Sequence, residues 1–290
     1  MRAPDRDAGR TAAKRGGGAM TGVPSLGLEQ IGVAALLVAF AAAISIALQL
    51  KLEKLLAIAA LRTVAQLLLV GYVLKYVFAL RSFVPVLAIV LVMVGLAGHA
   101  ALGRVKYSYR TAFLDTAVSL CVCGLLTAYV VTSLVLGIHP WYQPQYLIPL
   151  VGMILGNCLT GVSISLDQLL SDLVERRMEI EADLALGASA WEAAGEPLRE
   201  VVRRGMIPTI NAMLVVGIVS LPGMMTGQIL AGSSPLLAVK YQIMVMFMLA
   251  GATSAGCVLV VLLAFRRVFT RRHQLDETML LRKDISPPRR

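Results

Sequence analysis

Two methionines and a threonine stand beside a helix-breaking pair in an apolar stretch of this sequence. Met224, Met225 and Thr226 follow Pro222 and Gly223 in the run LPGMMTG. This pair breaks or kinks a helix, and backbone groups freed at membrane depth are tolerated only beside protein or a cavity. Thioether sulfur suits Cu(I) or loosely held Fe(II). The pattern therefore allows a metal path, but methionine more often fills gaps in packed cores, and both interpretations stay open.

Arg62 and Gln66 are polar residues within the second apolar stretch. They stand four residues apart, so a helix brings both to one face. A charge inside a span costs on the order of 3 kcal/mol unless protein or water surrounds it, so Arg62 needs a partner. We expect that partner to be Asp115, which lies at comparable depth in the fourth stretch. The pair is either a gate or substrate contact, or a structural lock between helices.

Asn157 lies in the fifth apolar stretch among Gly152, Gly156, Thr160 and Gly161. Small residues at this spacing let helices approach closely, and a polar side chain there hydrogen-bonds to a neighbouring helix. We expect packing with one interhelical hydrogen bond. A place on the translocation path is the alternative.

Motifs for other chemistry are missing from the sequence. The cysteines lie in apolar runs without a CxxC pair, so neither a disulfide framework nor a zinc site is expected. No Ser/His/Asp or Cys/His set is evident, and there is no G-x-x-x-x-G-K-S/T phosphate loop. We therefore expect no enzymatic activity and no cofactor bound by this chain, and any ATP must be hydrolysed by another chain.

The elements that carry these residues are predicted to be membrane helices. Of the 290 residues, 58% are hydrophobic and 15% charged, whereas soluble domains average about 45–50% apolar and about 25% charged residues. A bilayer core of roughly 30 Å needs about 20 apolar residues per helix. The sequence predicts an all-α integral membrane bundle with about seven transmembrane helices, at residues 27–49, 55–79, 83–103, 112–137, 146–166, 208–231 and 240–265.

Basic residues mark one side of the membrane. Lys and Arg cluster after the first, third, fifth and seventh stretches, whereas the connection GIHPWYQPQ has no charge and GSSPLLAVK has only Lys240. The positive-inside rule predicts a multi-pass protein of the inner (plasma) membrane, with its N-terminus outside and its C-terminus in the cytoplasm. The net charge of +10 is divided among these clusters, so no nucleic-acid partner is expected.

Both ends of the chain are polar. Residues 1–19 are basic and Gly-rich and predict disorder, and Met20 is an alternative start that the orientation favours. Residues 20–275 form the expected transmembrane domain, and residues 276–290 a polar cytoplasmic tail.

The loop at residues 167–207 is polar, unlike the stretches around it, and its pattern predicts cytoplasmic helices. Gly187 stands where a helix C-cap favours a positive φ. Ser189 and Glu192 form an S-x-x-E capping box, which opens a new helix.

The new helix is expected to be short. Gly195 and Pro197 should end it, and Pro197 can serve as the first residue of a third helix. Trp191 on the short segment would offer a large apolar side chain to a partner outside the bilayer.

The loop also carries the first sign of a known family. Glu181, Ala182 and Gly187, in EADLALG, resemble the E-A-A-x-x-x-G loop of ABC transporter permeases, with Asp183 in place of the second Ala. The runs LRTVAQLLLVGYVL, GMILGN and LPGMMTG look like those of the iron-export ABC permease family of the FetB type, which is related to plant aluminium-tolerance membrane subunits. The resemblance covers roughly Gln30 to Leu275.

The resemblance implies the permease subunit of an ABC transporter that exports iron or a related metal. It also implies a separate cytosolic ATPase, which binds ATP and Mg, and a coupling role for Glu181, Ala182, Gly187, Ser189 and Trp191. Symmetry with two ATPase subunits predicts a permease homodimer in the membrane lipid. Two alternatives remain: a permease for a nucleotide sugar or other small anion, and a non-transporting scaffold that recruits a cytosolic partner.

Overall fold

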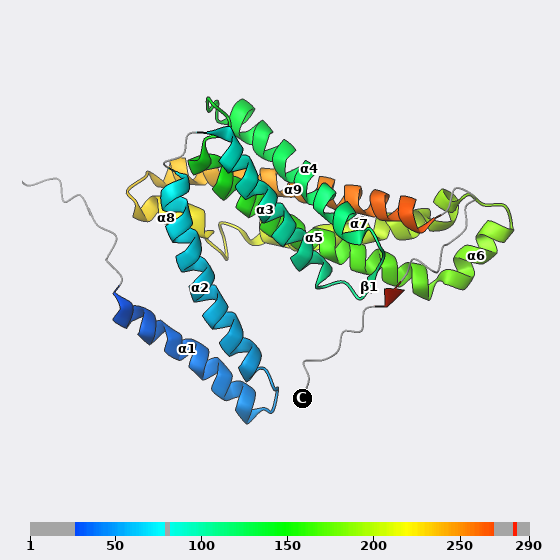
Figure 1. The fold of residues 1–290 in the computed structure, drawn as a ribbon, viewed down its shortest axis with the longest axis horizontal. Coiled ribbons are helices and arrows are strands. Elements are labelled where there is room, and N and C mark those ends of the chain that lie inside the picture. The colour runs from blue at the N-terminus through cyan, green and yellow to red at the C-terminus, as the bar shows by residue number, and fades with distance from the viewer. Residues whose placement is uncertain (1–26, 79–81, 270–280, 283–290) are drawn as a thin grey trace, which may run out of the picture. The chain divides into compact units, whose positions relative to one another are not determined.

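The computed structural model describes residues 27–78, 82–269 and 281–282, and it is almost entirely helical (Figure 1). The leader expected at residues 1–19, Met20 and most of the tail expected at 276–290 lie outside the described residues. Two short strands, β1 (Tyr107–Ser108) and β2 (Leu281–Arg282), pair antiparallel. The helices are α1 (Leu28–Ala47), α2 (Glu53–Val77), α3 (Phe83–Leu102), α4 (Ala112–Tyr129), the π-helix η1 (Val130–Val135), α5 (Pro144–Glu175), α6 (Arg177–Ala185), α7 (Ala190–Val215), α8 (Gly223–Leu230) and α9 (Pro235–Val268).

The chain divides into two compact units. Unit 1 holds the described residues up to Val64 together with Leu221–Gln242, that is α1, the first part of α2, α8 and the start of α9. Unit 2 holds Ala65–Ser220 and the described residues from Ile243 onward. Unit 2 therefore contains α3 to α7 and most of α9.

In the described part of the chain, six helices are long and apolar enough to cross a membrane, rather than the seven expected from the sequence. They are α1, α2, α3, α4 with η1, α5 and α9. The expected span at 208–231 is wrong as a continuous helix, because α7 ends at Val215 and α8 begins only at Gly223. Gly217 between them has a φ of +85°, and Pro222 is the N-cap of α8. The predicted break near Pro222 is therefore confirmed, and α8 alone is too short to span a bilayer.

Helix α5 is much longer than the span predicted at 146–166. Its 32 residues correspond to about 48 Å at 1.5 Å per residue, against roughly 30 Å for a bilayer core. Its C-terminal half buries Leu166, Leu169, Leu170 and Leu173 completely. This buried apolar stripe continues past the expected end of the span, so α5 is longer than a bilayer core requires.

Glycines let α5, α7 and α9 approach one another closely inside unit 2. A Cβ atom on Gly161 of α5 would lie 2.9 Å from the carbonyl oxygen of Gly205 on α7 and 3.0 Å from Sγ of Cys257 on α9. The first distance is shorter than real Cβ contacts and the second is at the tight end of their range, so only glycine fits here without a shift of its neighbours. Cys123, Cys158 and Cys257 are buried as free thiols and pack as small apolar residues.

The connection between α3 and α4 is anchored to α5. The backbone N–H of Lys106 donates to Oδ1 of Asp167 at 2.7 Å, and a guanidinium nitrogen of Arg104 lies 3.5 Å from Oγ1 of Thr160. This connection joins two spans, so it lies at a membrane surface. The part of α5 around Thr160 and Asp167 therefore lies at the same surface.

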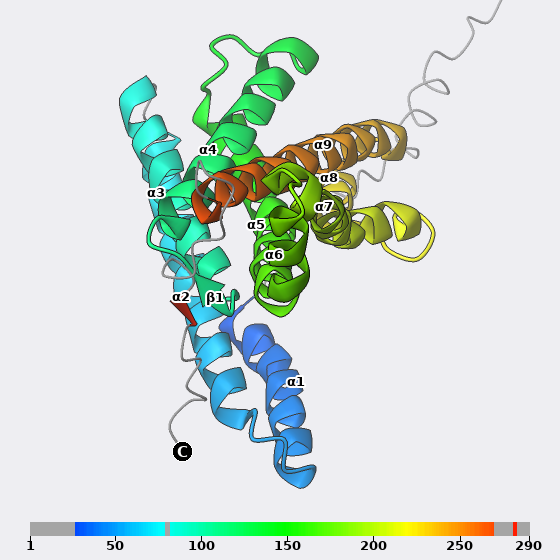
Figure 2. The ribbon, with the colours of Figure 1, turned by 90° about the vertical axis from the view of Figure 1, so that its right-hand side faces the viewer.

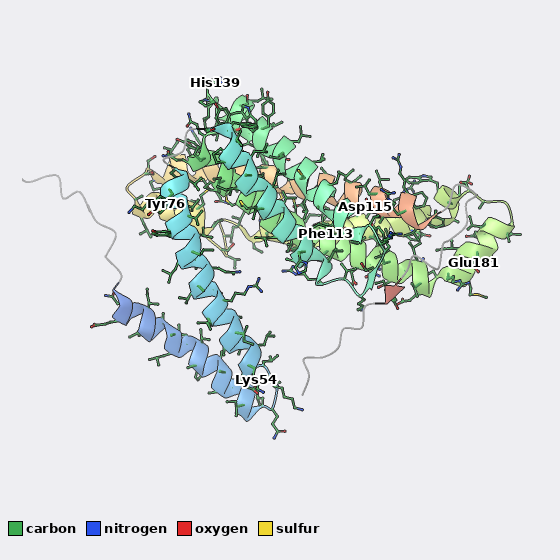
Figure 3. The ribbon with its side chains drawn as sticks, viewed as in Figure 1. Lys54, Tyr76, Phe113, Asp115, His139 and Glu181 are labelled. Atoms are coloured by element: carbon green, nitrogen blue, oxygen red, sulfur yellow. The ribbon has the colours of Figure 1, made fainter. Side chains whose placement is uncertain are left out.

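The opposite end of unit 2 is aromatic. Trp141 packs edge-on against Phe83, Tyr129 and Tyr142, with ring centroids 5.4–6.0 Å apart. Figure 3 shows His139 at this end and Glu181 at the other end of the same unit. Trp and Tyr gather at membrane–water interfaces, so this cluster is consistent with the second surface.

Candidate functional site

The turn after α6 has the geometry that the sequence predicted. Gly187 has a φ of +98°, a conformation that costs other residues free energy because of their Cβ. Its N–H donates to the Leu184 carbonyl at 3.1 Å, and the Ala188 N–H donates to the Asp183 carbonyl at 3.0 Å. The predicted C-cap glycine is confirmed.

The predicted capping box at the start of α7 is also confirmed. The backbone N–H of Glu192 donates to Oγ of Ser189 at 3.3 Å, and the backbone N–H of Ser189 donates to a carboxylate oxygen of Glu192 at 2.8 Å. These bonds satisfy two donors that a helix start leaves open. The hydrogen bonds from Ser189, from its backbone first and then from its side chain, lower the pKa of Glu192.

The expected short helix after Gly187 is wrong, because α7 runs without interruption from Ala190 to Val215. It passes through Gly195, Pro197 and Pro208. A proline inside a helix removes one backbone hydrogen bond. Here α7 lies along α5 (Figure 2) and buries one face that includes Pro197. Tertiary packing on α5 thus outweighs the local preference for a break.

The short helix of this loop is therefore α6, which lies before Gly187 instead of after it. We call α6 together with the turn at Gly187 the elbow. Its Ile180 is buried and holds α6 to the rest of unit 2. Two large apolar side chains near its ends point into solvent: Met178 is 79% exposed and Leu186 is 87% exposed. An apolar pair on a polar helix outside the spans is typical of a docking surface.

Glu181 and Ala182, two residues of the permease motif that the sequence resembles, lie on this helix. Glu181 accepts a hydrogen bond from Nε of Arg177 at 2.9 Å, in a pair whose side chains are each about 40% exposed. Exposed pairs of this kind contribute roughly 0.5 kcal/mol or less. Glu181 is therefore a surface residue here, and Ala182 is exposed beside it.

Trp191 is placed against its own chain on one side. Its ring lies 5.5 Å from that of Phe265 on α9, edge to face, and 53% of the residue stays exposed. The side chain also lines an apolar groove between α7 and α9. About half of Trp191 stays exposed, while the other half fixes α7 to α9, and its contact with a partner stays a prediction.

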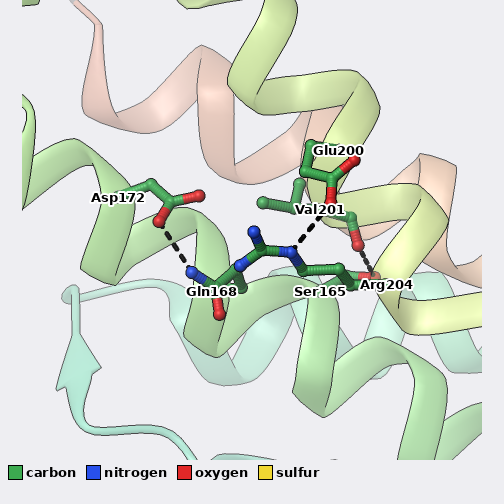
Figure 4. A network of polar contacts seen from close by, with 6 residues as sticks. All are labelled: Ser165, Gln168, Asp172, Glu200, Val201 and Arg204. Atoms are coloured by element: carbon green, nitrogen blue, oxygen red, sulfur yellow. Dashed lines mark hydrogen bonds and ion pairs between the residues drawn. The ribbon is translucent and has the colours of Figure 1, made fainter.

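A charged cavity between the C-terminal end of α5 and the first half of α7 was not foreseen. It measures about 410 Å³ and is lined by Asp172, Arg176, Glu196, Pro197, Arg199, Glu200, Arg203 and Arg204. Figure 4 shows the polar contacts on its α5 and α7 sides. The signal was in the sequence, because Glu196, Glu200 and Arg203 share a helical face. The arginines also fit the positive-inside pattern, which hides their second role in the sequence.

Asp115 has a different partner from the expected Arg62 within unit 2, and its pairing with Arg62, which belongs to unit 1, stays a prediction. Asp115 is buried at the start of α4 and lies 3.6 Å from Nε of Arg267 on α9. Thr111 also donates to its carboxylate at 3.1 Å. Burial, and then the negative charge of Asp115, raise the pKa of the nearby Tyr109 phenol. Asp115 thus ties the start of α4 to the end of α9.

Arg62 and Gln66 are exposed on α2. No residue in the most apolar window of α2 is buried by the described part of the chain. The predicted shared face follows from their spacing on this one continuous helix. Their place on a translocation path stays a prediction.

Asn157 does not make the interhelical hydrogen bond that we expected. Its side-chain nitrogen donates to the Met153 carbonyl of its own helix at 3.0 Å, and the residue is exposed. The close packing predicted for the glycines around it is present at Gly161. The amide of Asn157 therefore stays at the exposed surface of α5.

The residues after the break belong to α8 in unit 1. Pro222 caps α8, and Thr226 donates to the Pro222 carbonyl at 3.1 Å. Met225 is buried and Met224 partly buried. Within the described residues there is no group of three or more His, Cys, Asp or Glu side chains that could hold a metal ion. A metal role for Met224 and Met225 stays a prediction.

Comparisons with known proteins cover nearly the whole described chain. The family model described as "Uncharacterised protein family (UPF0014)" matches residues 28–269. The Escherichia coli protein named probable iron export permease protein FetB is 36% identical over 255 residues, which cover 88% of this chain and 97% of that one. The UPF0014 membrane protein slr1647 of Synechocystis is 40% identical over 217 residues, covering 74% and 83%.

A plant relative shows how far the similarity extends. ALUMINUM SENSITIVE 3 of Arabidopsis thaliana is 30% identical over 250 residues, which cover 86% of this chain and 90% of that one. No solved structure matches this chain significantly. From the matched family and these relatives, together with the six long apolar helices, the chain is a multi-pass helical membrane protein that belongs to the UPF0014 family.

Proposed function

We propose that the protein is the permease subunit of an ABC exporter that moves iron or a related metal out of the cell. The cargo follows from the relative named a probable iron export permease. The sequence contains no phosphate loop of its own. A separate ATPase subunit, which binds ATP and Mg, therefore supplies the energy, and this chain binds neither.

The observation that carries the proposal is the elbow formed by α6 and the turn at Gly187. It lies outside the six candidate spans and exposes Met178 and Leu186. It also contains Glu181, Ala182 and Gly187, the residues that resemble the permease coupling loop. A short amphipathic helix that lays its apolar side chains into a groove is a common mode of recognition. We assign this role to α6 and its partner groove to the ATPase.

The packing around the elbow supports transmission of movement. Helix α6 joins α5 to α7, and these two helices contact each other at Gly161 and Gly205 without room for a side chain. Displacement of α6 would thus move α5 and α7 together. ATP binding and hydrolysis change the state of the ATPase, and the coupled helices shift the permease between inward-open and outward-open states.

The proposed assembly is a permease homodimer with two ATPase subunits, with the elbow in the cytoplasm and the N-terminus outside. Each chain supplies one elbow, so two chains match two ATPases. Helices α1 and α2 bury 6% and 0% of their most apolar windows. Their surfaces therefore need lipid, the rest of the chain or a second copy around them, and this leaves room for a dimer interface.

The proposal is tested with the permease and its cognate ATPase, co-purified in lipid nanodiscs. ATP hydrolysis is measured with and without Fe(II) for wild type, Leu186→Glu and Leu186→Met. We expect iron to stimulate wild type and Leu186→Met. The glutamate should weaken ATPase binding about ten-fold or more by placing a charge in an apolar contact, while the permease still folds, because Leu186 is exposed.

Each other outcome identifies which part is wrong. If the complex forms but iron has no effect and a nucleotide sugar stimulates hydrolysis, the coupling is right and the metal cargo is wrong. If Leu186→Glu binds and couples like wild type, α6 is not the docking element. If no ATPase binds the wild-type chain, the protein is a scaffold for another partner and not an ABC permease.

A further inference from the structure

The charged cavity beside the elbow is a candidate ligand site. Its walls come from the end of α5, with Asp172 and Arg176, and from the first half of α7. Four arginines and three carboxylates line it, an excess of one positive charge from 4 − 3. The volume of about 410 Å³ is within the range of small-molecule sites, roughly 300–1,000 Å³.

Two of the three carboxylates are already engaged (Figure 4). Nε of Arg204 donates to Glu200 at 3.0 Å, and the amide nitrogen of Gln168 donates to Asp172 at 2.7 Å. In the described residues, no ion pair is present for Arg176, Arg199 or Arg203. Three guanidinium groups therefore face the cavity against one unengaged carboxylate, that of Glu196. This imbalance favours an anion.

The cavity begins at the level of a membrane surface. The Lys106 N–H contacts Asp167 of α5, and Lys106 lies in the connection between the spans α3 and α4. Oγ of Ser165 donates to the Val201 carbonyl at 3.0 Å. Because α5 and α7 run antiparallel, Asp167 is level with about residue 199. Arg199 thus lies where phospholipid headgroups lie.

An apolar groove adjoins the cavity and shares one residue with it. The groove measures about 300 Å³, and Arg199 lines both hollows. On helix α7 the groove face and the cavity face meet at this arginine. The end of the groove at Val202 and Val258 is the deeper one, because α7 continues from there toward the bilayer. The other lining residues of the groove are Trp191, Gly195, Leu198, Val261 and Leu262.

We propose that these two hollows form one site for an anionic phospholipid. Its phosphate group contacts Arg199 and Arg203, because guanidinium groups bind phosphate through paired, charge-assisted hydrogen bonds. Part of an acyl chain fills the groove along its length, from Val258 at the deeper end to Trp191 at the outer end. The site holds a lipid against α5, α7 and α9, next to the elbow, and does not require that the cargo be iron.

Trp191 provides a direct measurement, since it lines the groove and the chain has only one other tryptophan, Trp141. In a Trp141→Phe background, the full chain is reconstituted in vesicles that contain brominated phosphatidylglycerol or brominated phosphatidylcholine. Bromine on an acyl chain in the groove quenches Trp191. We expect half-maximal quenching at about ten-fold less phosphatidylglycerol, as one charge-assisted hydrogen bond would give.

Variants locate the effect. Arg199→Gln with Arg203→Gln should abolish the preference for the anionic lipid, whereas Arg110→Gln, an exposed arginine outside the cavity, should keep it. Equal quenching by both lipids in the otherwise wild-type chain overturns the lipid proposal, whether or not the variants fold. If inorganic phosphate changes Trp191 emission and no lipid preference is present, the anion is a soluble phosphate compound and not a lipid.

Discussion

Two regions of the molecule bury their apolar helices within the chain to very different extents. One is the bundle of α5, α7 and α9, and the other is the pair α1 and α2. In α5 and α9, 56% and 50% of the most apolar window is buried within the chain, whereas α1 and α2 bury 6% and 0%. The bundle is held by close contacts among its own side chains. The α1–α2 pair exposes nearly all of its apolar surface, so its environment, whether lipid or protein, determines how it is held. Composition alone does not distinguish the two, because all four helices are strongly apolar.

The largest expected effect comes from filling the glycine contact of the bundle. Gly161→Ala would place a Cβ atom 2.6 Å from Cγ2 of Thr253 and 2.9 Å from the Gly205 carbonyl oxygen. We expect it to destabilise the protein by about 3 kcal/mol or more, as overpacking of a tight core does. Thermal unfolding of the purified protein, followed by loss of the monodisperse species, measures this.

Gly71→Ala on α2 is the matched control. Nothing lies within 4 Å of the position of its Cβ, and alanine is the better helix former by roughly 1 kcal/mol. The variant should be as stable as wild type or slightly more so. If both substitutions have the same effect, the bundle is not more tightly packed than the α1–α2 pair.

A substitution of Arg62 tests whether α2 borders a translocation path. If Arg62 faces this path, Arg62→Leu should leave assembly with the ATPase intact and reduce iron-stimulated ATP hydrolysis about ten-fold or more. A ten-fold loss corresponds to roughly 1.4 kcal/mol of interaction with the cargo or gate. Val64→Ala, on the opposite face of the same helix, should retain activity. Full activity of Arg62→Leu would show that this charge has no part in transport.

What the sequence predicted well is local. All predicted spans except the one at 208–231 correspond to helices of membrane length, because a run of about 20 apolar residues has few alternatives to a membrane helix. Gly187, Ser189 and Glu192 were predicted because the caps depend on residues within one turn of each other. The break near Pro222 has the same origin, since proline and glycine act on their own segment of the chain.

What the sequence could not predict depends on distant partners. Asp115 pairs with Arg267, which is 152 positions away (267 − 115). The depth of Asp115 in its span made Arg62 an equally reasonable partner in the sequence. Helix α7 continues through Pro197 because α5 covers that face, which local rules do not include. The charged cavity exists only after α5 and α7 are placed side by side. In each case tertiary packing decided between locally acceptable alternatives.

The smallest expected effect concerns the turn between α1 and α2, where local conformation replaces packing. Gln49 has a φ of +52° although it is not glycine. The N–H of Leu52 donates to the buried Oγ of Ser45 at 2.9 Å and holds this turn. Gln49→Gly should remove the strain that the Cβ causes at positive φ and so stabilise the turn by roughly 1 kcal/mol. The greater conformational entropy of glycine in the unfolded chain reduces this gain. Slower hydrogen exchange at the amides of the turn would report this stabilisation.

Ser45→Ala should change the stability of the same turn by about the same amount in the opposite direction, because it leaves the Leu52 N–H without its acceptor. If neither variant changes exchange in the turn, the α1–α2 connection is fixed from outside, and local backbone conformation does not set it.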